Sequence, residues 1–148
     1  MSVDRSEAVA RLARDWLGTP YCHRAARKGI GCDCLGLVRG LWQDLHGAAI
    51  PPVPFYGAAW DEPDAGETLW RALARQLTEL PPSATMRPGQ ILLFRMRARA
   101  AARHVGVLSS AGATPDFRFI HAYERHGVIE SPLSLPWRRR VVARFEFH

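Results

Sequence analysis

Apolar residues recur three or four positions apart in three stretches of the first half of the chain, as they do on one face of an α-helix. This spacing predicts helices over about 5–17, from Cys34 to the residue before Gly47, and over about 67–79. Asp33 stands where an aspartate side chain caps a first helical turn, and glycine is common where Gly47 stands, just past a helix end. We therefore expect the second helix to begin at Cys34.

The second half of the chain changes to short runs of β-forming residues that are separated by glycine and proline. These runs cover residues 90–96, 104–109, 117–123, 127–131 and 140–147. Helices followed by a strand meander predict an α+β fold, with N-terminal helices packed on a roughly five-stranded antiparallel sheet. The proline-rich stretch 50–66 is expected to be an irregular loop. No repeat or linker divides the chain, so we expect one domain over residues 1–148.

Length and cysteine content narrow the class of protein. A chain of 148 residues can bury a single core without disulfide bonds or a structural metal. Its three cysteines, Cys22, Cys32 and Cys34, cannot all pair with one another, so they are not the disulfide framework of a small secreted domain. No apolar run is long enough to cross a bilayer, and the first residues lack the pattern of a signal peptide. We therefore expect synthesis in the bacterial cytoplasm and no membrane insertion.

The charge of the chain does not by itself identify a partner. Lys and Arg number 20 against 14 Asp and Glu, which gives a formal net charge of +6. The basic residues are mostly scattered, with one run at Arg138-Arg139-Arg140, and they lack the aromatic interleaving and motifs of nucleic-acid-binding domains. We therefore expect no specific nucleic-acid partner, although a basic protein is attracted to an anionic cell wall.

The position of Cys34 in a first helical turn has two chemical readings. The positive end of the helix dipole favours thiolate and can lower a cysteine pKa from about 8.5. Free backbone N–H groups at the same place can receive an oxyanion. Cys34 is therefore a candidate nucleophile, and the alternative is a small buried residue of the core.

A thiolate nucleophile needs a base and a third group that orients the base. A hairpin centred on residues 110–115 pairs residues whose numbers sum to about 225, and it therefore places His104 opposite His121. Directly opposed residues project to the same face of a sheet, with Cβ atoms roughly 5 Å apart. The hairpin thus predicts neighbouring imidazoles, whereas either histidine alone is more simply a hydrogen-bonded residue at a strand end.

Five short motifs follow one another along the chain: Gly18-Thr19-Pro20-Tyr21, Asp33-Cys34-Leu35-Gly36-Leu37-Val38, Arg87-Pro88-Gly89-Gln90, His104-Val105-Gly106-Val107 and Ile120-His121-Ala122. In these residues the chain resembles the NlpC-type cell-wall cysteine peptidases, a papain-like family that cleaves peptidoglycan stem peptides. The resemblance implies a papain-like NlpC-type fold, Cys34 as nucleophile, His104 as general base and His121 as its orienting partner. It also implies that Tyr21 and Asp33 contribute to the oxyanion and substrate-binding region, with no metal and no cofactor.

Leu35 replaces the usual serine of the cysteine motif, and Cys22-His23-Arg24 replaces the usual Gly-Gly after the tyrosine. The residues around Cys34 are similar to those in the branch of the family that is found in phage tails and gene transfer agents. That resemblance implies hydrolysis of the γ-D-glutamyl–diamino acid amide bond by an enzyme carried to the target cell wall in a particle. Its partners would be peptidoglycan stem peptides and tail or baseplate proteins.

Three alternatives remain open at this point. The site could be vestigial in a non-catalytic protein of tail or baseplate assembly or wall attachment. Cys22, His23, Cys32 and Cys34 could bind zinc, although their spacings differ from the paired Cys-x-x-Cys of zinc ribbons. Trp60 and Trp137 fall on no periodic core face, so each either covers the edge of the core or docks the chain on another protein.

Overall fold

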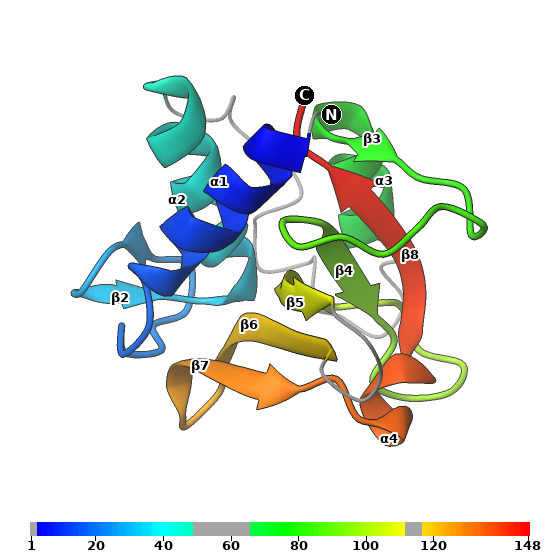
Figure 1. Cartoon of the computed structure of the whole chain (residues 1–148). Helices are drawn as coiled ribbons and strands as arrows, with labels where there is room; N and C mark the ends of the chain where they lie inside the picture. The colour runs from blue at the N-terminus through cyan, green and yellow to red at the C-terminus, as the bar shows by residue number, and fades with distance from the viewer. Residues whose placement is uncertain (1–2, 49–65, 112–116) are drawn as a thin grey trace.

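The computed structural model describes residues 3–48, 66–111 and 117–148, and the fold is that of these residues (Figure 1). In chain order the elements are α1 (Val3–Arg14), β1 (Ala26–Arg27), β2 (Gly31–Cys32), α2 (Cys34–His46), α3 (Thr68–Gln76), β3 (Thr78–Glu79), β4 (Ile91–Phe94), β5 (His104–Ala111), β6 (Phe117–Tyr123), β7 (Gly127–Pro132), α4 (Leu135–Arg138) and β8 (Val141–Glu146). No helix in this part of the chain is long and apolar enough to cross a membrane. The expected loop at 50–66, with Trp60, lies outside the described residues except for Gly66.

The strands form a six-stranded antiparallel sheet in the order β3-β8-β4-β5-β6-β7, and β1 pairs with β2 in a separate two-stranded sheet. The α+β prediction is confirmed, with six strands instead of five. The additional strand comes from residues 78–79, which were expected to end the third helix. Leu77 adopts an extended conformation after α3 and is 2% exposed, so its side chain stays in the core while the next two residues pair with β8.

The boundaries of the first two helices follow from how they pack on each other. α1 ends at Arg14, earlier than predicted, because the next residues form tight turns that bring Trp16 against α2. A Cβ at Gly40 of α2 would lie 2.1 Å from the Trp16 ring, so only glycine admits the indole there. The prediction for α2 is confirmed, since it runs from Cys34 to His46 and ends at Gly47 in the left-handed conformation.

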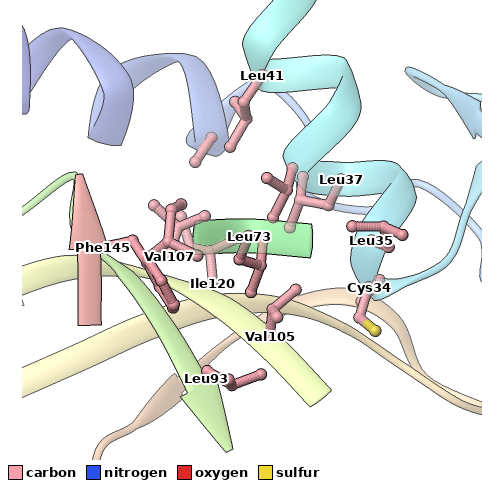
Figure 2. Close-up of a cluster of buried hydrophobic side chains, with 14 of the residues drawn as sticks. Cys34, Leu35, Leu37, Leu41, Leu73, Leu93, Val105, Val107, Ile120 and Phe145 are labelled. Carbon is pink, nitrogen blue, oxygen red and sulfur yellow. The ribbon is translucent and has the colours of Figure 1, made fainter. Parts of the chain in front are cut away.

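Buried side chains lie on both faces of the sheet. On the helix face, Val105, Val107 and Ile120 pack with the α2 leucines in one cluster, and Cys34 lies at one end of it (Figure 2). The outer face carries a smaller cluster of Leu92, Phe94, Leu108, Phe119 and Leu133, against which Trp137 packs. Successive strand residues point to opposite faces, so one face of β5 and β6 meets the helices and the other meets the chain around α4. The candidate site is a cavity lined by the first residue of α2 and the first residue of β5.

Candidate active site

Cys34 is the first residue of α2, and Asp33 holds it there. Oδ1 of Asp33 accepts a hydrogen bond from the Gly36 N–H at 2.7 Å, which caps the helix. Oδ2 accepts from the Arg24 N–H, also at 2.7 Å, and lies 3.7 Å from Nδ1 of His23. Asp33 is 1% exposed. It therefore joins the helix start to the preceding loop, and a substrate-binding role for it stays a prediction.

Gly36 has a steric reason to be glycine. A Cβ built there would lie 1.8 Å from the carbonyl oxygen of Ala25, much closer than atoms can approach. The backbone of the loop before β1 can therefore pack directly against the first turn of α2. The Asp-Cys-x-Gly spacing of the motif is explained by these two contacts, a cap from Asp33 and a close approach at Gly36.

His104 and His121 are brought together, as predicted, although the strand register is different. Nε2 of His104 lies 2.8 Å from Nδ1 of His121. Val107 pairs with Ile120 and Leu108 with Phe119, so on the side of the histidines facing residues have numbers that sum to 227 instead of 225. β5 continues to Ala111, two residues beyond the predicted end of this strand. A shift of two residues leaves the two histidines on one face, as diagonal neighbours, while a bulge between Leu108 and Ser110 changes the register further along.

Aromatic side chains of the outer face surround the two histidines. His121 is fully buried, and its ring centroid lies 4.2 Å from that of Phe119 and 5.3 Å from that of Trp137. The Trp137 ring also lies 5.9 Å from that of His104. Trp137 thus covers the histidine pair and the outer core cluster. This favours the interpretation that Trp137 covers the edge of the core over the interpretation that it docks the chain on another protein.

Cys34 and His104 line one cavity of about 460 Å³. Its other lining residues are Tyr21, His23, Asp33, Met96, Arg103, Ala122, Tyr123 and Glu124. The Cys34 thiol donates a hydrogen bond to the carbonyl oxygen of Arg103 over 3.6 Å. Arg103 is the residue directly before His104 in the sequence. The structure therefore gathers Cys34, His104, Tyr21 and Asp33 at one cavity, with His121 behind His104.

Burial sets the resting protonation of this site. It raises the pKa of the Cys34 thiol to about 12, and the neighbouring Asp33 acts in the same direction. It lowers the pKa of His104 to about 4 and that of His121 to about 3. The expected lowering of the thiol pKa by the helix start is therefore wrong in direction, because desolvation of the thiolate outweighs it. At neutral pH the cavity is therefore lined by the Cys34 thiol and by a neutral His104 imidazole, and a neutral imidazole can act as a base.

Tyr21 is held beside the cavity by an isolated parallel bridge to Cys32. Burial, with Cys34 and Asp33 adding to it, raises the pKa of the Tyr21 phenol. The hydroxyl therefore stays protonated and can donate a hydrogen bond. This is the property that the expected oxyanion role requires.

Two residues of the site were not indicated by the sequence pattern. Glu124 lies in the cavity wall, and Ser131 accepts or donates a hydrogen bond at His121. His23, which also lines the cavity, was named only as a candidate zinc ligand and as part of the segment that departs from the family's Gly-Gly. Within the described ranges, no group of three or more His, Cys, Asp or Glu residues could hold a metal ion.

Alkylation of Cys34 should depend on His104. In His104→Ala we expect the rate of iodoacetamide reaction with Cys34 at neutral pH to fall by about tenfold or more, because the group that accepts the thiol proton is gone. Mass spectrometry resolved by residue would give the rates. The exposed Cys22 is the internal control and should react equally fast in both proteins. Equal Cys34 rates would remove His104 from the role of base.

No family model matches the sequence, and no curated protein matches it. Among solved structures, the fold of this chain is that of the NlpC/P60 proteins. NlpC2 from Trichomonas vaginalis has a TM-score of 0.66 and 19% identity, over 99% of this chain and 48% of its own. A Staphylococcus aureus protein described as similar to lipoprotein, NLP/P60 family, has a TM-score of 0.62 and 18% identity, over 99% of this chain and 42% of its own.

A third similar structure is the NlpC/p60 domain of the peptidoglycan hydrolase SagA, with a TM-score of 0.60 and 20% identity. The match covers 96% of this chain and 98% of that domain. This chain therefore spans less than half of the first two structures and nearly the whole of the third. These similarities establish the fold that the sequence motifs predicted.

Proposed function

We propose that residues 1–148 are a single cysteine peptidase domain of the NlpC/P60 family and that it hydrolyses amide bonds in peptidoglycan stem peptides. The observation that carries this proposal is one cavity lined both by Cys34, at the start of α2, and by His104, whose Nε2 is hydrogen-bonded to His121. A nucleophile, a base and an orienting group are the parts that amide hydrolysis through a thioester requires. The fold shared with a peptidoglycan hydrolase domain supports the choice of substrate.

The first half of the reaction follows from the protonation of the site. Nδ1 of His104 is the ring nitrogen left for the reaction, because Nε2 is bonded to His121. It takes the Cys34 proton as Sγ attacks the amide carbonyl carbon, and the oxyanion forms near the first N–H groups of α2 and the Tyr21 hydroxyl. His104 then gives that proton to the leaving amine, and a thioester remains.

The second half repeats these roles with water. His104 takes a proton from water as the water oxygen attacks the thioester carbonyl carbon, and the proton passes to Sγ when the C–S bond breaks. The carboxylic acid leaves, and the thiol and neutral imidazole are restored. In this scheme the catalytic residues are Cys34 and His104. His121 orients the base, and Tyr21 stabilises the oxyanion.

For the substrate and setting, the proposal follows the sequence resemblance. The bond would be the γ-D-glutamyl–diamino acid amide, and the enzyme would act as part of a phage-tail-like or gene transfer agent particle during wall penetration. Arg138 and Arg139, both exposed, lie on α4 and its end and offer a basic surface for a tail or baseplate protein. Detection of this chain in purified particles would support the setting.

Incubation with purified sacculi tests the activity and the bond together. We expect soluble peptides that mass spectrometry identifies as products of the γ-D-glutamyl–diamino acid cut, and Cys34→Ala should release none. Release of peptides cut elsewhere would keep the peptidase and change the bond. Sacculi left intact by the folded wild-type chain would favour the alternative, a non-catalytic assembly or wall-attachment protein with a vestigial site.

A further inference from the structure

Three neighbouring strands carry a continuous chain of polar side chains away from the cavity. Nε2 of His104 on β5 lies 2.8 Å from Nδ1 of His121 on β6, and Nε2 of His121 lies 3.0 Å from Oγ of Ser131 on β7. β5, β6 and β7 lie side by side in the sheet (Figure 1). Both ring nitrogens of the fully buried His121 therefore have partners.

The strand register explains why Ser131 reaches His121. Ser131 pairs directly with Phe119, and directly paired residues project to the same face of a sheet. His121 is two positions from Phe119 on the same strand, so it shares that face. Ser131 and His121 are therefore diagonal neighbours, as His104 and His121 are on the other side. This arrangement is part of the fold of the sheet and does not depend on a loop.

The direction of the hydrogen bonds in this chain decides whether His104 can work as a base. A neutral imidazole carries one N–H and one lone pair. If His121 is protonated on Nε2, its Nδ1 accepts from His104 Nε2–H, and Nδ1 of His104 keeps the lone pair that takes the thiol proton. If His121 is protonated on Nδ1, the bonds reverse and His104 carries its proton on Nδ1. Only the first direction gives a base.

The reaction itself imposes the same direction. Once His104 has taken the Cys34 proton, both of its nitrogens carry hydrogen, so Nε2 must donate to His121. His121 must then hold its own proton on Nε2, which points at Oγ of Ser131. In a fully buried ring an N–H without an acceptor is costly. An acceptor at the position of Ser131 is therefore needed whenever His104 is protonated.

We propose that Ser131 is a positioning residue of the peptidase, which accepts the Nε2–H of His121 and so holds His104 in the tautomer that can act as a base. This inference rests on the proposed function, because it assigns Ser131 a part in the same reaction. Low pKa values keep both rings neutral at neutral pH, so a single tautomer can be defined for each.

Histidine tautomers can be measured in the resting protein by ¹⁵N NMR of the ring nitrogens, without any substrate. In the wild type we expect protonated Nε2 and unprotonated Nδ1 in both His104 and His121. In Ser131→Ala the reversed tautomers should become populated, and Ser131→Thr, which keeps the hydroxyl, should match the wild type. A wild-type His121 with its proton on Nδ1 would overturn the proposal even if Ser131→Ala failed to fold.

Kinetics supply the second readout. We expect Ser131→Ala to lower kcat on stem peptides by about tenfold with KM nearly unchanged. The resting variant can adopt the reversed tautomer, so the Nε2–H of His121 is left without an acceptor only when His104 is protonated during the reaction. Ser109→Ala is the matched control, since its hydroxyl donates to Glu130 over 2.6 Å instead of contacting a histidine, and its kcat should be unchanged. Unchanged tautomers and kcat in folded Ser131→Ala would refute the positioning role. Expected tautomers without any hydrolysis would refute the proposed function alone.

Discussion

His104→Ala should lose nearly all turnover of stem peptides, about 10²- to 10⁴-fold, whereas His121→Asn should keep a measurable part of it. In the proposed reaction His104 is the group that transfers protons, and alanine has no group that could replace it. In the proposed mechanism Nδ1 of His121 accepts the hydrogen bond from Nε2 of His104, 2.8 Å away, and an asparagine oxygen can accept it in the same way. Steady-state rates of the purified variants on a soluble stem peptide would measure both losses.

Circular dichroism and thermal unfolding must show that both variants are folded, since both histidines are buried. Complete and equal loss in the two folded variants would mean that His121 does more than orient His104. Rates near the wild type in both would exclude the pair from the site.

Mild acidification, below about pH 6.5, should destabilise the protein. Burial holds the pKa of His104 at about 4 and that of His121 at about 3, below the ordinary value of 6.5. Between pH 6.5 and these lower pKa values, the unfolded chain binds more protons than the folded one. The contribution of the two histidines to the free energy of unfolding is therefore complete above pH 6.5 and decreases as the pH falls. From about pH 7.5 to pH 5, the two groups together should cost roughly 4 kcal/mol of unfolding free energy.

Urea unfolding at a series of pH values would measure this loss. His104→Ala should lose roughly half of the pH dependence, because only one of the two buried groups remains. An unfolding free energy that stays constant from pH 7.5 to pH 5 would contradict a neutral buried pair.

Local sequence signals predicted the elements that build the site. Asp33 before an apolar helical face and Gly47 after it defined α2, because capping and stop signals act within one turn. Residues 78–79 could not be assigned in this way. Their pairing with β8 joins residues that are more than sixty positions apart, and only the folded chain brings them together.

The strand register at the two histidines and the pKa of the Cys34 thiol also depend on contacts that are distant in the sequence. The predicted hairpin placed His104 beside His121 with a register two residues off, and the pair survived because an even shift preserves the face. The direction of the thiol pKa was mispredicted, because the sequence shows a helix start and does not show how much water the fold removes from Cys34.

By itself the sequence determined the α+β order of elements, the position of Cys34 at a helix start and the spacing that lets two strands share a face, since these depend on neighbours along the chain. Only the tertiary structure decided that Trp137 covers the histidines and that Ser131 ends their hydrogen-bond chain. It also decided that burial keeps the imidazoles neutral. Packing between strands and desolvation depend on residues distant in sequence, so they arise only when the whole sheet has formed.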